Sequence, residues 1–383
     1  MNPNWPIKKL GEVVNFISGS QNINKGKAIS SGKYPAYSAS GQDIFLNTYE
    51  HEGPAIIVSW IGARCGKCFL ASGKWTAIAN TQILKIKNEN ECDYKYLFYF
   101  LNDERKWPRI GGAQPYISKS GAKRIEIPLP PLEIQKKIVA KIEELFEKID
   151  KAKELREKAL EETEQIFQSA LQEIFDKAEK KWKFQKLEDI VIEFQSGFAC
   201  SERATKNTGI PQLRPNNIGF NGEIDLSNLV FIPFKLTDLN KYNLKKGDVL
   251  FNNTNSKELV GRAALIKQDL DWVFSNHITR IRVNSRILSP EWLVVNMNYL
   301  WKIGYFLKIS QKWIGQAGIN TQMLKSIEIP LPPLPEQKKI VAYLDNLREK
   351  VEKLKKLQEE QLKDLEELKN SILDKAFKGE LLY

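Results

Sequence analysis

The sequence Ile127-Pro128-Leu129-Pro130-Pro131-Leu132 runs, two residues later, into Gln135-Lys136-Lys137-Ile138-Val139-Ala140, and the same twelve letters return at 329–334 and 337–342. The offset is 202 residues, and it holds without a gap from 127–175 to 329–377, with 24 identities in 49 aligned pairs. A repeat of this length without an insertion indicates one structural unit that the chain uses twice. The remaining sequence is interpreted relative to this pair.

Each copy begins as an extended segment and continues as a helix. Proline cannot donate to a helical hydrogen-bond ladder, so the prolines predict the extended start. Beyond them, apolar residues recur at steps of four and three, which is the coiled-coil rhythm. We expect two helices of about forty residues, roughly 60 Å long, that pair as a spacer; the alternative is two amphipathic helices that each pack on their own domain. The predicted seam consists of Ile138, Ile142, Leu145 and Ile149 in the first copy and Ile340, Leu344, Leu347 and Val351 in the second.

The positive charge of the chain lies outside these helices. The 383 residues carry a net charge of +11, which divides into +7 for 1–126, −2 for 127–181, +6 for 182–328 and 0 for 329–383. Two basic segments on a nearly neutral frame are typical of two domains that bind a polyanion such as nucleic acid. The predicted order along the chain is therefore globule, helix, globule, helix.

Composition also indicates a cellular compartment. No apolar run reaches the roughly 20 residues of a membrane span, and no signal peptide opens the sequence. The four cysteines, Cys65, Cys68, Cys92 and Cys200, are too few and too scattered for a disulfide scaffold. We therefore expect a protein of the reducing cytoplasm that has no membrane segment.

The two basic segments follow one plan. Short β-rich runs, such as 55–58, 82–86 and 248–251, are separated by Gly, Asn and Pro, which predicts small mixed α/β domains. Gln114 and Ile117 precede the first proline-rich segment at the same spacing at which Gln316 and Ile319 precede the second. The globules have diverged more than the helices, which suggests two different ligands of one class. Two DNA half-sites fit this pattern.

The sequence lacks the motifs of catalysis. An adenine methyltransferase needs a glycine-rich cofactor loop and an Asn-Pro-Pro-aromatic motif for the flipped base, and neither occurs here. The stretch 62–68 has one residue too few between its glycines for a P-loop, and a cysteine stands where Ser or Thr would bind magnesium. Cys65-x-x-Cys68 lacks the second pair that a zinc site needs. We predict no catalytic residue, no metal site and no cofactor in this chain.

Candidate DNA-binding residues lie in polar loops of both globules. Arg, Asn, Gln and Lys read base edges, while Lys, Arg and hydroxyl groups bind phosphates. In the first globule the candidates are Arg64, Lys67, Gln114, Tyr116, Ser118 and Lys119. In the second they are Arg214, Asn216, Asn217, Asn253, Asn255, Lys257, Arg262, Lys312, Gln316 and Asn320. The alternative for each of them is an ordinary solvated turn.

Three features together resemble the specificity subunits of type I restriction–modification systems. They are the Pro-Leu-Pro-Pro-Leu-x-x-Gln motif at 128–135 and 330–337, the ending Ala376-Phe377-Lys378-Gly379-Glu380-Leu381, and the order of the four segments. The first copy departs slightly, with Ile134 where the second has Glu336. The resemblance implies an α+β protein with a pseudo-twofold repeat. Two mixed α/β target-recognition domains, 1–126 and 182–328, would alternate with two helical regions, 127–181 and 329–383, whose long helices form an antiparallel coiled-coil spacer.

The resemblance also implies a function that is not catalytic. Each recognition domain would read one half of a bipartite target in double-stranded DNA, and the helices would set the gap and dock two methyltransferase subunits. Restriction-translocase subunits would join them, and S-adenosylmethionine, ATP and magnesium would bind only to these partners. Two other interpretations are a coiled-coil scaffold that binds only proteins and a targeting subunit of another DNA-modifying enzyme. The two basic globules argue against the scaffold.

Overall fold

The computed structural model describes residues 5–21, 23 and 32–382, with the side chain of Trp313 excepted, and the chain divides into two compact units. Unit 1 comprises residues 1–159 and 358–383, and unit 2 comprises residues 160–357. Each long helix contributes one part to each unit. The C-terminal residues 358–383 therefore fold together with the N-terminal part of the chain. The four segments defined from the sequence have boundaries that differ from those of the two units, and their assignment as domains remains a prediction.

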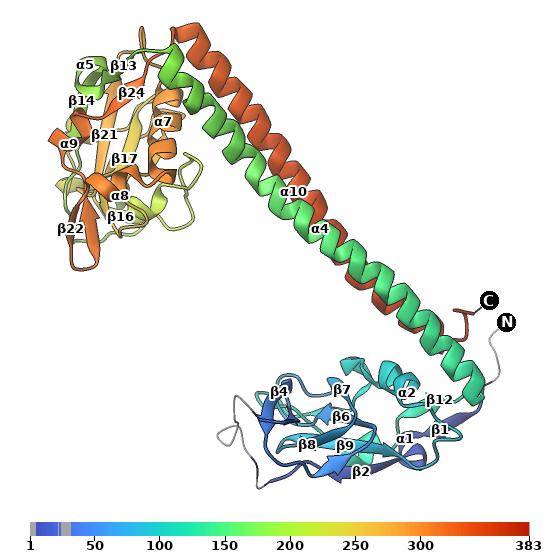
Figure 1. The fold of residues 1–383 in the computed structure, drawn as a ribbon. Coiled ribbons are helices and arrows are strands. Elements are labelled where there is room, and N and C mark those ends of the chain that lie inside the picture. Colours follow the sequence, from blue (N-terminus) through green and yellow to red (C-terminus); the bar gives the residue numbers. More distant parts are fainter. Residues whose placement is uncertain (1–4, 22, 24–31, 383) are drawn as a thin grey trace. The chain divides into compact units, whose positions relative to one another are not determined.

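Unit 1 contains two four-stranded sheets (Figure 1). The first has the order β2 (Val14–Ser18), β9 (Thr81–Ile86), β6 (Ala55–Ser59) and β7 (Cys68–Ala71), with antiparallel neighbours throughout. The second has the order β4 (Gly41–Leu46), β3 (Tyr34–Ser38), β8 (Lys74–Ala77) and β5 (His51–Glu52), and its β3–β8 pair is parallel. The other elements are β1 (Ile7–Lys9), α1 (Leu10–Val13), α2 (Tyr94–Leu101), a 3₁₀ turn at Glu104–Lys106, β10 (Arg109–Ile110), β11 (Tyr116–Ile117), α3 (Lys119–Ala122) and β12 (Glu126–Pro128).

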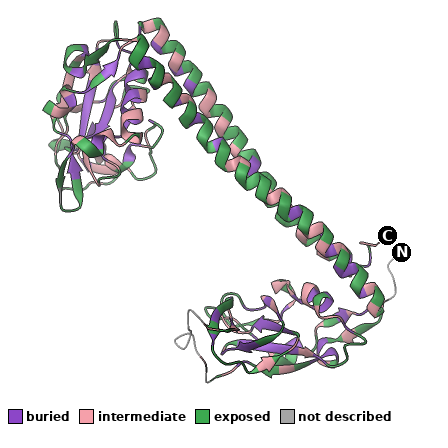
Figure 2. Ribbon diagram, in the orientation of Figure 1, coloured by how far each residue is buried: buried purple, intermediate pink, exposed green. Residues whose placement is uncertain are grey.

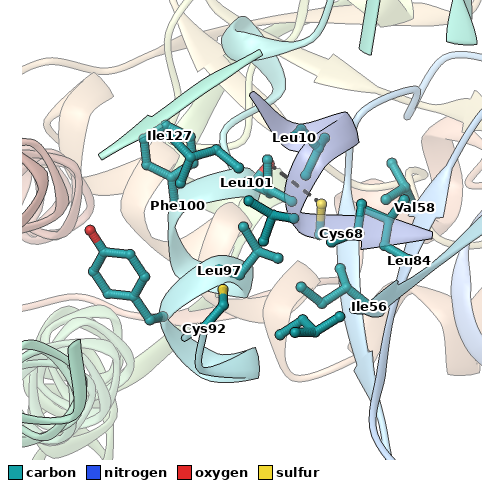
Figure 3. Close-up of a cluster of buried hydrophobic side chains, with 14 of the residues drawn as sticks. Leu10, Ile56, Val58, Cys68, Leu84, Cys92, Leu97, Phe100, Leu101 and Ile127 are labelled. Carbon is teal, nitrogen blue, oxygen red and sulfur yellow. Dashed lines mark hydrogen bonds between the residues drawn. The ribbon is translucent and has the colours of Figure 1, made fainter. Parts of the chain in front are cut away.

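The core of unit 1 forms where α2 packs on the first sheet. All five residues of β6 are buried, and its β-branched run Ile56-Ile57-Val58 favours a strand that is covered on both faces. Helix α2 begins at the cap Asp93, whose carboxylate accepts a hydrogen bond of 2.9 Å from the Tyr96 amide. Figure 3 shows Leu97 and Leu101 of α2 among the sheet residues of this cluster.

Unit 2 follows the general plan of unit 1 and adds elements such as α6 (Leu239–Tyr242) and β18 (Thr254–Asn255). Its main sheet has the order β14 (Val191–Ser196), β21 (Ile278–Val283), β17 (Val249–Asn252) and β19 (Ala263–Leu265). Helix α7 (Pro290–Lys302) packs on it, and Ser289 caps that helix with Pro290 in the first turn. The other elements are β13 (Phe184–Lys186), α5 (Leu187–Ile190), β15 (Gly209–Leu213), 3₁₀ turns at Pro215–Asn217 and Phe234–Leu236, β16 (Val230–Pro233), α6 (Leu239–Tyr242), β18 (Thr254–Asn255), β20 (Val273–Phe274), α8 (Tyr305–Ile309), β22 (Gln311–Trp313), β23 (Gln316–Gly318), α9 (Thr321–Lys325) and β24 (Glu328–Pro330).

The repeat extends from the helices into the globules. β1 pairs with β12 in unit 1 at the register at which β13 pairs with β24 in unit 2. Tyr96 Oη donates to the Pro128 carbonyl at 2.7 Å, and Trp292 Nε1 donates to the Pro330 carbonyl at 3.0 Å. A fully buried aromatic residue of α2 or α7 thus holds the start of the proline-rich segment in each unit. The similarity of the two globules, faint in the sequence, is plain in the structure.

The long helices are α4 (Leu132–Lys181) and α10 (Leu334–Phe377), and they run antiparallel. In unit 1 Lys153 pairs with Glu366 at 2.7 Å, and Asp150, three residues earlier, pairs with Lys369, three residues later. In unit 2 the pairing continues in the same sense from Glu164 with Lys355 to Lys181 with Glu336. The predicted fold of two mixed α/β globules and two paired helices is confirmed.

The predicted seam is buried to different degrees along the helices (Figure 2). Ile138, Ile142, Ile149 and Leu344 are buried, whereas Leu145, Ile340, Leu347 and Val351 are half-buried. Near its start each helix contacts both a globule and the other helix. Ile138 and Ile142 of α4 belong to one apolar cluster with Leu97 of α2 and Ile372 of α10. Val341 and Leu344 of α10 belong to one with Trp292 of α7 and Phe167 of α4. The start of each helix is thus part of the globule core as well as of the helix pair. Among the described residues, no helix is long and apolar enough to span a membrane.

Candidate nucleic-acid interface

In unit 1 the structure brings the two polar loops chosen from the sequence together. β10 and β11 form a two-stranded hairpin, and the loop after β6 pairs with its second strand. The Gly62 amide donates to the Pro115 carbonyl at 2.8 Å, and the Ile117 amide donates to the Trp60 carbonyl at 3.1 Å. The loop that carries Arg64 and Lys67 therefore lies beside the hairpin that carries Gln114 and Tyr116.

The selected side chains of unit 1 differ in what they contact. Gln114, Tyr116 and Lys119 are exposed, and Lys67 is half-buried. Arg64 is exposed and donates to the Ser40 carbonyl at 2.9 Å. Ser118 instead caps α3, and its hydroxyl accepts from the Gly121 amide at 3.1 Å. The hydroxyl of Ser118 thus stabilises the start of α3, directly after the hairpin.

Unit 2 contains the same arrangement as a three-stranded sheet in the order β18, β23, β22. The Ile319 amide donates to the Asn253 carbonyl at 2.8 Å, which matches the bond between Ile117 and Trp60 in unit 1. Five of the selected residues therefore lie on this sheet or beside it: Asn253, Asn255, Lys312, Gln316 and Asn320. Lys257 lies in the turn that follows β18.

Two of these five side chains hold the local structure. Asn253 is 7% exposed, and its amide donates to Thr279 Oγ1 at 2.9 Å and to the Asn276 carbonyl at 3.2 Å. Asn320 caps α9 by accepting from the Met323 amide at 2.9 Å. Lys312 and Gln316 are exposed on the hairpin, and Asn255 is half-buried. The hairpin therefore presents Lys312 and Gln316 to solvent.

Four further candidates in unit 2 lie around a cavity of about 530 Å³ and the turn beside it. Asn216 and Arg262 line the cavity. Arg262 is 4% exposed and stacks 4.4 Å from the centre of the Phe220 ring, and burial lowers the pKa of its guanidinium. Asn217 is buried, accepts from the Arg214 amide at 2.9 Å and donates to the Asp225 carbonyl at 2.8 Å. Asn217 therefore shapes this turn through its own side chain.

Both hairpins lie in stretches of the chain that contain basic but no acidic residues. The selection of candidates by loop composition did not use this signal. Residues 105–125 contain six basic and no acidic residues, and residues 302–327 contain four lysines and no acidic residue. Internal contacts occupy part of this charge, because Arg109 pairs with Glu104 and Lys106 lies 4.0 Å from the centre of the Phe100 ring. Burial lowers the pKa of Lys106. Lys308 and Lys312 have no ion-pair partner among the described residues. Like charges in and beside a solvated hairpin suit a polyanionic ligand.

The cysteines of unit 1 belong to the core. Cys65, Cys68 and Cys92 are buried, and Cys68 Sγ lies 3.4 Å from the Leu101 carbonyl (Figure 3). Burial raises the pKa of Cys68 and raises that of Cys92 to about 12, so both thiols are protonated at neutral pH. A protonated thiol is a poor nucleophile and a poor metal ligand. Among the residues that the structure describes, no three His, Cys, Asp or Glu side chains are placed to hold one ion.

Two α/β globules that share one plan, each with a solvated hairpin in a basic stretch of the chain, are typical of a protein that binds a polyanion such as DNA. The sequence model of the type I restriction modification DNA specificity domain matches residues 2–162 and 179–363. The chain belongs to this family of DNA specificity subunits. Recognition of DNA is accordingly its function, as the sequence resemblance predicted.

Proteins similar to this chain match it over nearly its full length. The type I restriction enzyme MjaVIII specificity subunit of Methanocaldococcus jannaschii is 28% identical over 418 aligned positions, which cover 98% of this chain and 93% of that protein. A solved chain from work on complex assembly and conformational transition of the type I R-M system has a TM-score of 0.73 at 22% identity, over 99% of this chain and 98% of that one. The HsdS subunit of Thermoanaerobacter tengcongensis has a TM-score of 0.63 at 22% identity, over 99% and 97%. The two solved structures share the fold of this chain.

Proposed function

We propose that the two globules read the two halves of a bipartite DNA target. The observation that carries this proposal is the matched pair of hairpins, because the Ile117–Trp60 bond in unit 1 has its counterpart in the Ile319–Asn253 bond in unit 2. Each globule presents the hairpin from the same place in its fold, and the exposed residues differ between the two. One frame with two sets of exposed side chains suits two half-sites of different sequence.

The chain would supply recognition and geometry, and its partners the chemistry. The sequence lacks a cofactor loop and a base-binding motif, and the protonated thiols of Cys68 and Cys92 are unsuited to nucleophilic chemistry. S-adenosylmethionine, ATP and magnesium would bind to methyltransferase and restriction-translocase subunits. The helix pair would set the length of the unread gap between the half-sites.

Docking of a methyltransferase subunit is supported by a large cavity in unit 2. The cavity measures about 910 Å³ and lies where α7 meets the parts of α4 and α10 that belong to this unit. Leu171, Val294 and Val341 contribute to its wall. Charged residues such as Lys246, Glu291 and Asp345 complete the wall, and a cavity of this size with both apolar and polar groups is typical of a contact site for another molecule. We propose that a methyltransferase subunit covers it.

The test is co-expression of the chain with a methyltransferase subunit encoded beside it, followed by mapping of modified adenines in the host genome. A split motif with a fixed unread gap, which appears only when this chain is present, is the expected result. Modification at an uninterrupted site would preserve DNA targeting and reject the two-half-site geometry. An active methyltransferase that co-purifies with the chain yet modifies no site would reject the proposal.

Exchange of residues 182–326 for the same segment of a relative tests the independence of the halves. We expect one half-site to change and the other to persist, because each globule has its own core. Loss of both half-sites, in a chimera that still binds the methyltransferase subunit, would show that the two globules do not recognise DNA separately.

A further inference from the structure

The second strands of the two hairpins can be aligned residue by residue from their hydrogen bonds. Ile117 and Ile319 bond to the equivalent residues Trp60 and Asn253, and one position earlier Tyr116 pairs with Ile61 as Gly318 pairs with Thr254. Two positions further back, the same count reaches Gln114, in the loop between β10 and β11, and Gln316, the first residue of β23, and the 202-residue offset of the repeat aligns the same two glutamines. The match therefore rests on strand pairing as far as Tyr116 and Gly318, and on sequence spacing beyond them.

Both glutamines are available to a ligand. Each side chain is exposed, and neither amide has a hydrogen-bond partner among the described residues. Their neighbours are engaged: Ile117 and Ile319 are buried in the two cores, and Ser118 and Asn320 cap the helices that follow. Each hairpin thus keeps an unoccupied amide side chain at the aligned position, while the anchoring residues that follow it are fixed.

An amide side chain has a preferred partner in the major groove. Its oxygen accepts from N6 of adenine while its nitrogen donates to N7, and no other base presents this pair of groups on one edge. We propose that Gln114 and Gln316 make this same contact in the two half-sites, so that each half-site contains an adenine read at the corresponding position. This inference rests on the proposed function, and it names a base that the two halves share.

The residues near each glutamine would then distinguish the sequences of the two half-sites. In unit 1 Tyr116 pairs across the hairpin with Ile110, and the two side chains are 44% and 47% exposed. In unit 2 the matching pair is Gly318 with Gln311. An aromatic and an aliphatic side chain suit contact with a thymine methyl group, whereas Gln311 offers hydrogen bonds. The base pair next to the shared adenine therefore differs between the two halves.

The test uses the complete complex with its methyltransferase partner and duplexes that carry its mapped motif. Each adenine in turn is replaced by 7-deazaadenine, which lacks the N7 acceptor and keeps Watson–Crick pairing. For the wild-type chain, one such replacement in each half-site is expected to weaken binding on the order of tenfold. Gln114→Ala should abolish that sensitivity in one half-site only, and Gln316→Ala in the other half-site only.

The matched control is Gln185→Ala, because Gln185 is an exposed glutamine in β13 and lies outside both hairpins. It should leave sensitivity to 7-deazaadenine as in the wild type. The inference is overturned if the two hairpin variants keep the wild-type sensitivity, or if they relax recognition of different kinds of base. Absence of sequence-specific binding by the wild-type complex would instead count against the proposed function, so the two failures are distinguishable.

Discussion

Gln135 and Gln337 make the same three hydrogen bonds in their respective units. Gln135 Oε1 accepts from the Asp93 amide at 2.9 Å, and Nε2 donates to the carbonyls of Glu91 and Pro130 at 2.8 and 2.7 Å. The bonds of Gln337, all 2.8 Å long, join it to the Ser289 amide and to the carbonyls of Ile287 and Pro332. Each glutamine, fully buried, ties the start of a long helix to the cap of α2 or α7. The glutamine of the repeated motif is therefore the joint between helix and globule.

Removal of this joint should destabilise one unit at a time. Gln135→Leu leaves one amide and two carbonyl groups without partners, and each buried orphan costs about 1–3 kcal/mol. We expect unit 1 to lose about 3 kcal/mol or more of unfolding free energy, and Gln337→Leu to do the same in unit 2. Hydrogen exchange measured by mass spectrometry on the full chain locates the loss. The exposed neighbour Lys136→Ala is the control, and a uniform increase in exchange over both units would contradict the assignment.

The last aromatic residue of α10 should stabilise the first globule. The ring of Phe377 lies 5.4 Å from that of Tyr96 and 5.1 Å from that of Phe100. Phe377→Ala removes this edge-on packing, so we expect unit 1 to lose about 2–4 kcal/mol and peptides from α2 to exchange faster. The equivalent Phe175 stacks at 3.7 Å on Tyr299 of α7. Phe175→Ala should produce the same loss in unit 2, and an effect of Phe377→Ala on unit 2 alone would contradict the fold.

We expect the two copies of the motif to differ in their dependence on pH, because Ile134 stands where the second copy has Glu336. A hydrogen bond from Lys181, aided by one of 3.2 Å from Trp182 Nε1, lowers the pKa of Glu336 below its usual 4.5. A lowered carboxyl pKa contributes stability that is present above pH 4.5 and is lost as the pH falls through the folded-state value. Glu336→Gln should therefore destabilise unit 2 at pH 7 and lose its effect at low pH. Urea titrations at several pH values measure this, with the exposed Glu359→Gln as the control; a pH-independent difference would exclude the charge as its cause.

An equal insertion in both helices should lengthen the unread gap of the DNA target. One heptad inserted between Ala159 and Leu160, and another between Leu357 and Gln358, preserves the phase of the seam. Seven residues add about 10 Å of helix, the length of about three base pairs. We expect the mapped motif to keep both half-sites with a gap about three base pairs longer. A heptad in one helix alone is the control and should abolish modification, whereas altered half-sites would argue against a spacer.

The lysine on the second hairpin should bind phosphate without reading sequence. Lys312 is exposed and has no ion-pair partner among the described residues. Lys312→Ala should weaken binding equally to matched and mismatched duplexes and should reduce the slope of log K against log salt by about one. Fluorescence anisotropy over a salt series measures both quantities. Lys186→Ala, on β13, is the control, and a change in base preference for Lys312→Ala would assign that residue to base reading instead.

The sequence by itself determined the repeat, the two long helices and the ligand class. Periodicity and proline placement act locally, so the spacing from Ile138 to Ile149 was enough to predict a helix with a seam. The charge of each segment is a sum over residues and needs no coordinates. The family motif added antiparallel pairing, which the ion pairs of Asp150 and Glu164 show directly in the two units. These features depend on residues that are close in the sequence or on sums over residues, and both can be read from the sequence.

The tertiary structure alone decided what each polar side chain does. Asn217, Asn253, Ser118 and Asn320 share the composition of solvated loops with Gln316, yet the first two are buried in internal hydrogen bonds and the next two cap helices. A donor or acceptor that is bonded within the fold is no longer free for a base, and its partners come from strands and turns distant in sequence. The same reason places Phe377 in the first globule: its partners on α2 precede it by more than 270 residues, and only the antiparallel return of α10 brings them together.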